Sequence, residues 1–373
     1  MNSSLSDTWS NGSGRLVIDL DAIATNYRTL TTKLGGVSCG ACVKANAYGL
    51  GMERVAQVLA REGCNDFFFS FMEGAIRLRY MLPEVRIHVF SGLAAGKPAD
   101  FVQYNMIPVL NSLGDIKGWS EYCRATDTSP PASIHIDSGM SRLGLPEVEV
   151  KTVLDDPSIL KGLNLELVMS HLACADESDH PKNKQQLDYF RTFQSKFSVK
   201  AASLANSSGI FLGPQYHFDL ARPGAAIYGI NPTPDTPSPM RQVIRLQGKI
   251  MQVQPVDTPQ SVGYGANYKI NGPSRIATVG AGYADGYLRS LSGNATVYIN
   301  DIPIQVVGRV SMDMISIDVT NVPEHLCQTG MSVDLIGPHN DVDALAKSAG
   351  TIGYEILTSL GRRYERTYLS ETD

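Results

Sequence analysis

The chain has 373 residues, 43% of them hydrophobic and 18% charged, and this balance is typical of a globular protein rather than a disordered or fibrous one. The formal net charge of -5 argues against nucleic-acid binding, because such a protein needs a basic surface to displace counterions. The length exceeds one ordinary domain and fits a barrel of about 250 residues followed by a smaller module.

The N-terminal tail, residues 1–14, is polar and lacks the apolar segment of a secretory signal, and no run of about 18 apolar residues occurs in the chain. Six cysteines are dispersed along the sequence, as is usual in a reducing compartment. We therefore expect a cytoplasmic protein that does not bind membranes. Cys39 and Cys42 form a CxxC pair, but on an expected strand their side chains point to opposite faces and cannot form a disulfide.

After the tail, residues 15–20 are expected to form a short strand, and Asp19 or Asp21 can cap a helix that runs to about Leu34. Eight apolar runs typical of buried strands follow. They are residues 37–44, 66–71, 86–91, 107–111, 132–137, 165–171, 202–206 and 225–229. Segments between them, such as 52–62, 72–81 and 182–196, have helical apolar spacing. This alternation predicts an α/β fold, a TIM-like (β/α)8 barrel of parallel strands.

The composition changes at residues 231–240, NPTPDTPSPM, where four prolines cannot continue a helix or a central strand. We expect a linker here, at the end of a barrel domain of residues 1–240. Residues 241–373 contain mostly alternating β-patterned runs, with Asn300 and Asp301 as a hairpin turn, so a mostly β C-terminal domain is predicted. One stretch of it, residues 342–360, has helical spacing.

Residues 43–51, VKANAYGLG, place Lys44 at the end of the first apolar run, with Tyr48 and two glycines after it. An amine held there by loop and backbone can lose enough solvent to act as a nucleophile that forms an imine. A solvated lysine at a strand edge is the other interpretation that the residues alone allow.

In a (β/α)8 barrel the reactive groups lie on the loops after the strands, and a phosphate site commonly follows the seventh and eighth strands. Polar residues occur at these positions. They are Lys44 after the first run, Arg142 after the fifth, His171 at the end of the sixth, Asn206, Ser207 and Ser208 after the seventh, and Arg222 with Gly224 at the entry to the eighth. Such a set suits a phosphorylated cofactor.

Neither a metal nor a nicotinamide cofactor is expected. His171, Cys174, Asp176 and His180 do not have the spacing of a zinc site. In residues 280–286, GAGYADG, the third glycine is one position late for a dinucleotide-binding loop and both flanks are β-patterned.

The segment VKANAYGLG resembles the signature of the alanine racemases, enzymes of fold type III that use pyridoxal 5'-phosphate (PLP), and the resemblance covers nearly the whole chain. It implies that Lys44 carries PLP, that Arg222 faces the pyridine nitrogen and that His171 packs beside the ring. The other residues implied to bind the cofactor, chiefly through its phosphate, are Tyr48, Asn206, Ser207, Gly224, Ala225 and Tyr354.

The same resemblance assigns substrate contacts. Arg142 in DSGMSRLG is implied to lie near the cofactor's ring oxygen and the substrate carboxylate. In the second domain, Tyr264 in VGYGANY matches the family's catalytic tyrosine, and Tyr283, Met312 and Asp313 match positions of the substrate pocket. These residues and Tyr354 are implied to close a small pocket, which favours a substrate with a methyl side chain.

The implied reaction is interconversion of L-alanine and D-alanine. Inversion requires a proton taken from one face and returned on the other, so Lys44 is assigned to one face and Tyr264 to the opposite face. Since the ordinary pKa of tyrosine is about 10, cationic neighbours must favour the phenolate, and His171 and Arg222 are candidates. In the family this tyrosine comes from the neighbouring subunit, which implies a homodimer with shared sites.

Three alternatives remain. They are a PLP racemase of broader or serine specificity, a PLP decarboxylase of the same architecture, and a non-catalytic PLP carrier that would need only the barrel.

One position departs from the family pattern. Many racemases have at residue 135 a lysine that becomes carbamylated and holds the arginine, whereas this chain has His135. We expect Arg142 to be held instead by neutral His135, by a carboxylate such as Asp137, or by an inorganic anion. Near the ordinary histidine pKa of about 6.5, a proton on His135 is expected to repel Arg142.

Overall fold

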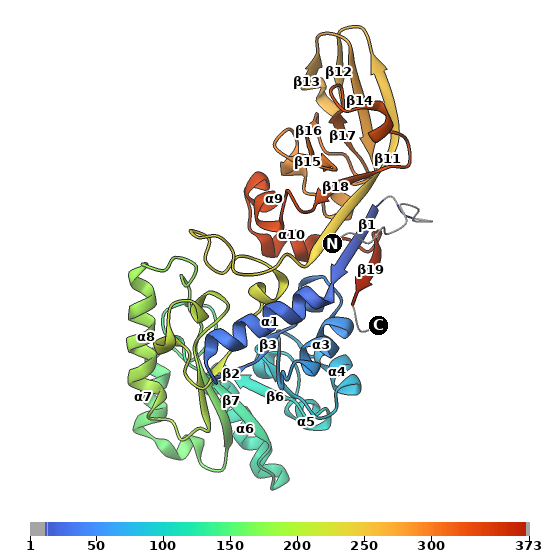
Figure 1. Cartoon of the computed structure of the whole chain (residues 1–373). Coiled ribbons are helices and arrows are strands. Elements are labelled where there is room, and N and C mark those ends of the chain that lie inside the picture. The colour runs from blue at the N-terminus through green and yellow to red at the C-terminus, as the bar shows by residue number, and fades with distance from the viewer. Residues whose placement is uncertain (1–11, 13, 371–373) are drawn as a thin grey trace. The chain divides into compact units, whose positions relative to one another are not determined.

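The computed structural model describes residue 12 and residues 14–370. The chain divides into two compact units, Ile23–Arg241 and a second unit that joins Met1–Ala22 to Gln242–Asp373. The first division falls inside helix α1 (Leu20–Leu34), whose start is capped as expected because the Ala22 N–H donates to Asp19 Oδ1 at 2.8 Å. Figure 1 shows the elements of both units along the chain.

The first unit, Ile23–Arg241, is built on a seven-stranded parallel sheet whose strands follow one another in chain order. The strands are β3 (Ala41–Cys42), β4 (Asp66–Phe69), β5 (Arg86–Val89), β6 (Ile107–Leu110), β7 (Pro131–His135), β8 (Asn164–Met169) and β9 (Ala201–Ser203). The helices between them are α2 (Lys44–Tyr48), α3 (Met52–Arg61), α4 (Met72–Met81), α5 (Pro98–Gln103), α6 (Leu113–Thr126), α7 (Glu147–Asp155) and α8 (Pro181–Gln194). The first seven expected strands are thus confirmed. Their apolar side chains are buried because helices follow the strands of a parallel sheet and cover it.

The eighth expected strand, residues 225–229, is wrong. Residues Ala225–Tyr228 form a 3-10 helix, η5, and the strand is the earlier β10 (Leu220–Ala221). A short apolar run does not distinguish a buried strand from a buried helical turn, and Pro223 and Gly224 end the strand before the run begins.

Backbone hydrogen bonds connect β10 on both sides. It pairs in parallel with β2 (Ser38–Cys39), which directly precedes β3. On its other side, the N–H groups of Asp219 and Arg222 donate to the carbonyls of Ala202 and Ala205 at 3.0 and 2.9 Å. The strand order and the crossover helices are those of a TIM-like barrel.

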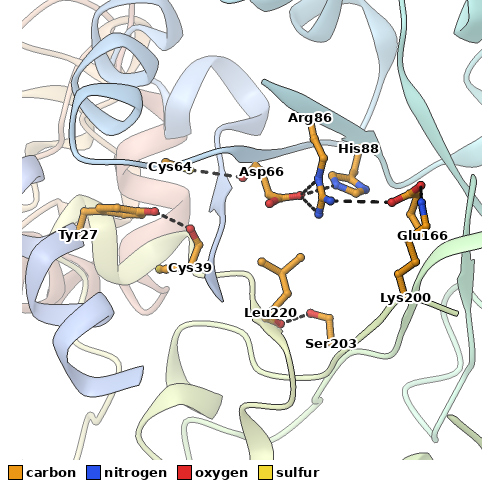
Figure 2. Close-up of polar contacts among 10 residues, drawn as sticks. All are labelled: Tyr27, Cys39, Cys64, Asp66, Arg86, His88, Glu166, Lys200, Ser203 and Leu220. Carbon is orange, nitrogen blue, oxygen red and sulfur yellow. Dashed lines mark hydrogen bonds and ion pairs between the residues drawn. The ribbon is translucent and has the colours of Figure 1, made fainter. Parts of the chain in front are cut away.

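An ionic cluster centred on the buried Asp66 and His88 lies toward the amino-terminal ends of these strands, away from the loops that carry the candidate site residues. Asp66, the first residue of β4, accepts from Arg86 Nε at 2.8 Å and bonds to His88 Nε2 at 2.9 Å. Figure 2 shows this group with Glu166 and Lys200, which are linked at 2.5 Å. Residues at this end of a TIM-like barrel contribute to stability rather than to catalysis.

The second unit contains an eight-stranded mixed sheet in the order β14-β17-β16-β15-β18-β11-β1-β19. Its strands are β1 (Gly14–Asp19), β11 (Ile244–Val256), β14 (Ser274–Val279), β15 (Thr296–Ile299), β16 (Ile302–Val307), β17 (Ile315–Asp318), β18 (Ser332–Ile336) and β19 (Glu365–Leu369). The expected hairpin turn between β15 and β16 is confirmed, with Asn300 at a φ of 50°.

Strand β1 pairs antiparallel with β11 and parallel with β19, so it belongs to this sheet. Residues 1–240 are expected from the sequence to form one domain, whereas the compact units place this first strand with the C-terminal residues. The helical stretch expected at 342–360 is two helices, α9 (Val342–Ala349) and α10 (Gly353–Ser359), because Gly350 ends the first in a left-handed conformation at a φ of 70°. Among the described residues, none of the helices has the length and apolar character needed to cross a membrane.

Candidate active site

Lys44 begins the short helix α2, directly after strand β3, and is half-buried. The turn that follows is left-handed: Ala45, Asn46, Ala47 and Tyr48 have φ values of 51°, 57°, 53° and 53°. Among the residues of this turn, asparagine tolerates this conformation best, whereas the two alanines and Tyr48 adopt it at a cost. The Asn46 side chain also accepts the Met52 N–H at 2.9 Å, which fixes the start of the next helix.

The turn brings Tyr48 against the loop that follows β10. A Cβ atom added at Gly224 would lie 2.3 Å from the Tyr48 hydroxyl oxygen, so only glycine allows this approach. Ser207 Oγ accepts the N–H groups of Gly224 and Ala226 at 3.0 and 3.1 Å. The structure therefore brings Tyr48, Ser207, Gly224 and Ala225 together in a cradle of hydroxyl and amide groups at the start of η5.

Asn206 stabilises the turn next to this cradle. Its Oδ1 accepts the Gly209 N–H at 2.9 Å and so shapes the turn that follows Ser207. Its Nδ2 donates to the Leu172 carbonyl at 3.5 Å, a long contact with the neighbouring loop.

Arg222 is 2% exposed and extends within the barrel unit. Its Nη1 donates to Ser203 Oγ, which donates in turn to the Leu220 carbonyl, and its Nη2 donates to the Ser170 carbonyl at 2.6 Å. The Nε of Arg222 is buried without a hydrogen-bond partner among the described residues. Burial lowers the pKa of Arg222 to about 10, so the guanidinium stays charged at neutral pH.

His171 lies beside this guanidinium. Its Nδ1 is 3.5 Å from Arg222 Nη2, and because an arginine only donates, Nδ1 is the acceptor. Burial, followed by the charges of Arg222, Arg142 and Lys44, holds the pKa of His171 well below 6.5. His171 is therefore neutral at neutral pH, with its proton on Nε2, and of the two candidate cations only Arg222 carries a charge.

Arg142 is exposed and ends a loop that is organised by Asp137. The Asp137 carboxylate accepts the backbone N–H groups of Gly139, Met140 and Ser141 at 2.9 to 3.1 Å. Among the described residues, the Asp137 carboxylate makes these backbone contacts and no ion pair with Arg142. It shapes the loop that carries the arginine instead.

His135 makes a different contact from the one expected. Its Nδ1 lies 2.9 Å from Asn111 Oδ1, so Nδ1 carries the proton. Burial, with the charges of Arg222 and Arg142, lowers the pKa of His135 to about 3. The expectation that His135 gains a proton near pH 6.5 is therefore wrong: at that pH it is a neutral neighbour of Arg142.

We expect the stability of the protein to depend on pH because three of its histidines have lowered pKa values in the folded state. His88, His135 and His171 all have lowered pKa values when folded, whereas each titrates near 6.5 when unfolded. Below pH 6.5 the unfolded chain binds more protons, so the free energy of unfolding should fall by up to about 4 kcal/mol per pH unit from the three together. Above pH 6.5 these groups should contribute no slope. Urea unfolding from pH 8 to pH 5 measures this, and His135→Asn should lose about 1.4 kcal/mol per pH unit of the slope. A variant with the parent's slope would contradict the neutral buried state.

Five further site candidates and a supporting arginine lie on the β unit. Tyr264 begins the 3-10 turn η6 (Tyr264–Ala266), between β12 (Gln260–Val262) and β13 (Tyr268–Ile270), and is 71% exposed. The turn packs on Arg309, since a Cβ at Gly265 would lie 2.8 Å from Arg309 Nη1.

Tyr283, Met312 and Asp313 are brought together. The N–H groups of Tyr283 and Ala284 donate to the carbonyls of Ser311 and Met312, both at 3.0 Å, and Asp313 pairs with Arg363 at 2.6 Å. Tyr354 lies on α10. Tyr264, Tyr283, Met312 and Tyr354 are all exposed, together with Met314 and Ile352.

Several polar residues that position the site were not predicted from the sequence. Ser170 and Ser203 hold Arg222, Asn111 holds His135, and Gln186 on α8 bonds to the loop after β8. Nothing in the sequence distinguishes them from ordinary polar residues, because each becomes important only through burial next to a charged or backbone partner.

Comparison with known proteins places the chain in a family. Residues 18–232 match the family model "Alanine racemase, N-terminal domain" and residues 243–368 match "Alanine racemase, C-terminal domain". An alanine racemase of Rhodospirillum rubrum is 49% identical over 95% of this chain and 95% of its own length, and a catabolic alanine racemase of Mesorhizobium japonicum is 46% identical over 95% and 93%. The crystal structure of a Bartonella henselae alanine racemase with covalently bound pyridoxal phosphate is 38% identical, with a TM-score of 0.92 over 96% of this chain and 99% of that one. The chain belongs to the alanine racemase family, and the resemblance seen in its motifs is confirmed.

Proposed function

We propose that this chain is a PLP-dependent racemase that interconverts L-alanine and D-alanine. The observation that carries the proposal is the convergence of Lys44, the Tyr48–Ser207–Gly224 cradle and buried Arg222 in the barrel unit. Homologues named alanine racemase over almost the whole chain support it. Incubating the purified, PLP-loaded protein with L-alanine should yield D-alanine, measured by chiral chromatography. No D-alanine from a protein that binds PLP would reject the proposal.

The residues fit PLP. A cradle that a Cβ at Gly224 would fill, bordered by the Ser207 hydroxyl and the start of η5, suits a phosphate, and the unpartnered Arg222 Nε is a buried donor that needs an acceptor such as a pyridine nitrogen. Lys44 would hold the cofactor covalently, Tyr48, Ser207, Gly224 and Ala225 would contact its phosphate with Asn206 supporting the turn, and His171 would pack beside its ring. Bound PLP supplies an electron sink that makes the α-proton of an attached amino acid acidic.

The protein's residues then move that proton. Lys44 takes or returns it on one face of the α-carbon and Tyr264 on the other. Arg222 remains protonated and would only donate to the ring nitrogen of bound PLP, which would keep that nitrogen unprotonated and limit the strength of the electron sink. This arrangement favours return of the proton to the α-carbon over its transfer to the cofactor.

Substrate recognition rests on a cation and a small pocket. Arg142 would bind the substrate carboxylate, and Tyr264, Tyr283, Tyr354 and Met312, with Asp313, would limit the side chain to a methyl group. Serine is the second candidate substrate, because a hydroxyl adds little volume. The ratio of kcat/KM for alanine to that for serine distinguishes the two specificities. A PLP carrier is disfavoured because residues 243–368 match the family's C-terminal domain.

A homodimer with shared sites is part of the proposal. Among the described residues of the β unit, seven large apolar side chains are exposed, Tyr264 included, and exposed apolar groups of this kind commonly mark an interface. We further infer that β2 with β3, the six strands β4 to β9, and β10 close as a (β/α)8 barrel. We place the enzyme in the cytoplasm, in keeping with six free cysteines. Supply of D-alanine for peptidoglycan and breakdown of alanine both suit the reaction.

Gly224→Ala should weaken cofactor binding. The added Cβ would lie 2.3 Å from the Tyr48 hydroxyl oxygen and displace that ring from the cradle. We expect the PLP dissociation constant to rise by at least about tenfold, equal to about 1.4 kcal/mol. Gly272→Ala is the matched control, because a Cβ there meets no atom within 4 Å. Equal PLP affinity in the Gly224 variant and the control would argue against a phosphate site at this position.

A further inference from the structure

Gln186, on α8, is fully buried and joins two loops of the barrel mouth. Its Oε1 accepts the Ala173 N–H at 2.9 Å, and its Nε2 donates to the His171 carbonyl at 2.8 Å. Both bonds connect helix α8 to the loop that follows β8. The same Nε2 donates to Ser138 Oγ at 3.1 Å, in the loop that follows β7.

The orientation of this amide is fixed by its backbone partners. The Ala173 N–H can only meet the amide oxygen, and the His171 carbonyl can only meet the amide nitrogen. Glutamine is therefore the residue type that satisfies both, since a carboxylate would face the His171 carbonyl with a second acceptor.

Each loop that Gln186 holds carries a residue of the site. The loop after β8 contains His171 and the Ser170 carbonyl, which accepts from Arg222 at 2.6 Å. The loop after β7, residues 136–146, contains Asp137, Ser138 and Arg142. The Ser138 and Ser170 hydroxyl oxygens lie 2.6 Å apart, so a hydrogen bond between these two side chains also joins the two loops directly.

We propose that Gln186 is a positioning residue for racemisation, one that sets His171 and Arg222 against the cofactor ring and Arg142 against the substrate carboxylate. The inference rests on the proposed function, since it concerns the PLP and substrate contacts of that same site. Gln186 would act through two backbone groups of the loop after β8 and through the Ser138 hydroxyl of the loop after β7. A residue that merely filled the interface between α8 and the sheet would need neither its donor nor its acceptor.

Asn183 is a matched control on the same helix. It is 2% exposed, and its Nδ2 donates to the carbonyls of Cys174 and Glu177 at 3.0 and 2.8 Å. These bonds hold the outer part of the loop after β8, beyond the residues that face Arg222. Its replacement should lower stability without moving His171.

The test compares Gln186→Leu, Gln186→Glu and Asn183→Leu with the parent. In Gln186→Leu the visible circular dichroism of bound PLP should change, the PLP dissociation constant and the KM for alanine should rise, and kcat/KM should fall by about 10- to 100-fold, since small misplacements of reacting groups have such effects. Asn183→Leu should keep the parent's dichroism, PLP affinity and KM while its melting temperature falls. The dichroism and PLP affinity do not depend on turnover.

Gln186→Glu gives a second, independent measurement. Burial raises the pKa of a carboxyl group, and only the protonated form can donate to the His171 carbonyl. The dichroism of this variant should therefore approach the parent's as the pH falls. This measurement tests the proposal even if Gln186→Leu does not fold. Gln186 would be only a packing residue if both variants kept the parent's dichroism, PLP affinity and KM at every pH. A parent that binds no PLP or makes no D-alanine would instead reject the proposed function itself.

Discussion

Replacing Lys44 by alanine should remove the covalent link to PLP and abolish racemisation. Lys44 follows strand β3 and precedes by four residues Tyr48, whose hydroxyl approaches Gly224. Loss of a group that serves as both attachment point and base should lower kcat/KM by at least about 10³-fold. The measurement is the visible absorbance of the covalently held cofactor, together with D-alanine formation.

Lys151→Ala is a suitable control for that experiment, because Lys151 is an exposed residue of α7 that pairs only with Glu147 one turn away. It should retain full absorbance and activity. A Lys44 variant that kept the parent's absorbance band would show that another amine holds the cofactor.

Tyr264→Phe should slow removal of the α-proton from one enantiomer far more than from the other. If Tyr264 and Lys44 serve opposite faces of the α-carbon, loss of the hydroxyl removes one base and leaves the second. Loss of a positioned acid or base lowers the rate by about 10² to 10⁴-fold. Exchange of the α-proton with deuterated water, followed separately for L-alanine and D-alanine by proton NMR, measures both directions. Equal slowing of the two would contradict the two-base arrangement.

The same variant tests the shared site. In a mixed dimer of Lys44→Ala and Tyr264→Phe chains, one of the two sites would contain both intact bases if each site draws on two chains. Mixing the inactive proteins under conditions of subunit exchange should then restore activity, whereas neither protein alone would recover it. Absence of recovery after verified exchange would show that each chain completes its own site.

The strands of the barrel were predictable because each is a short, unbroken apolar run between helical segments, and burial on both faces demands that pattern. The eighth was not, because residues 225–229 are as apolar as a strand yet form η5. The sheet that β1 joins was likewise hidden, since its pairing with β11 and β19 joins residues more than 200 positions apart. Sequence patterns describe which face is buried, not which distant strand is the neighbour.

The candidate site divides in the same way. Lys44, Tyr48, Ser207 and Arg222 could be named from motifs, because chemistry requires those side chains at the ends of the strands. The neutrality of His135 and His171 could not, because it follows from burial beside Arg222 and Arg142. Gln186 could not be predicted for a similar reason. Its role depends on hydrogen bonds to two backbone groups of another loop, and the sequence does not show which backbone groups a glutamine will meet.

The left-handed turn after Lys44 determines which enantiomer of an amino acid suits its backbone best. Ala45, Ala47 and Tyr48 adopt a backbone that costs an L-residue about 1–2 kcal/mol each, so the segment stores about 3–6 kcal/mol, close to the lower end of the net stability of a domain. That backbone is the ordinary right-handed helix seen in a mirror, and it is the preferred conformation of D-residues. An Ala45 of D configuration, introduced by chemical synthesis, would therefore relax this strain at an exposed position. The loop proposed to bind the cofactor of an enzyme that makes D-alanine is a place where D-alanine would fit the chain better than the residue it has.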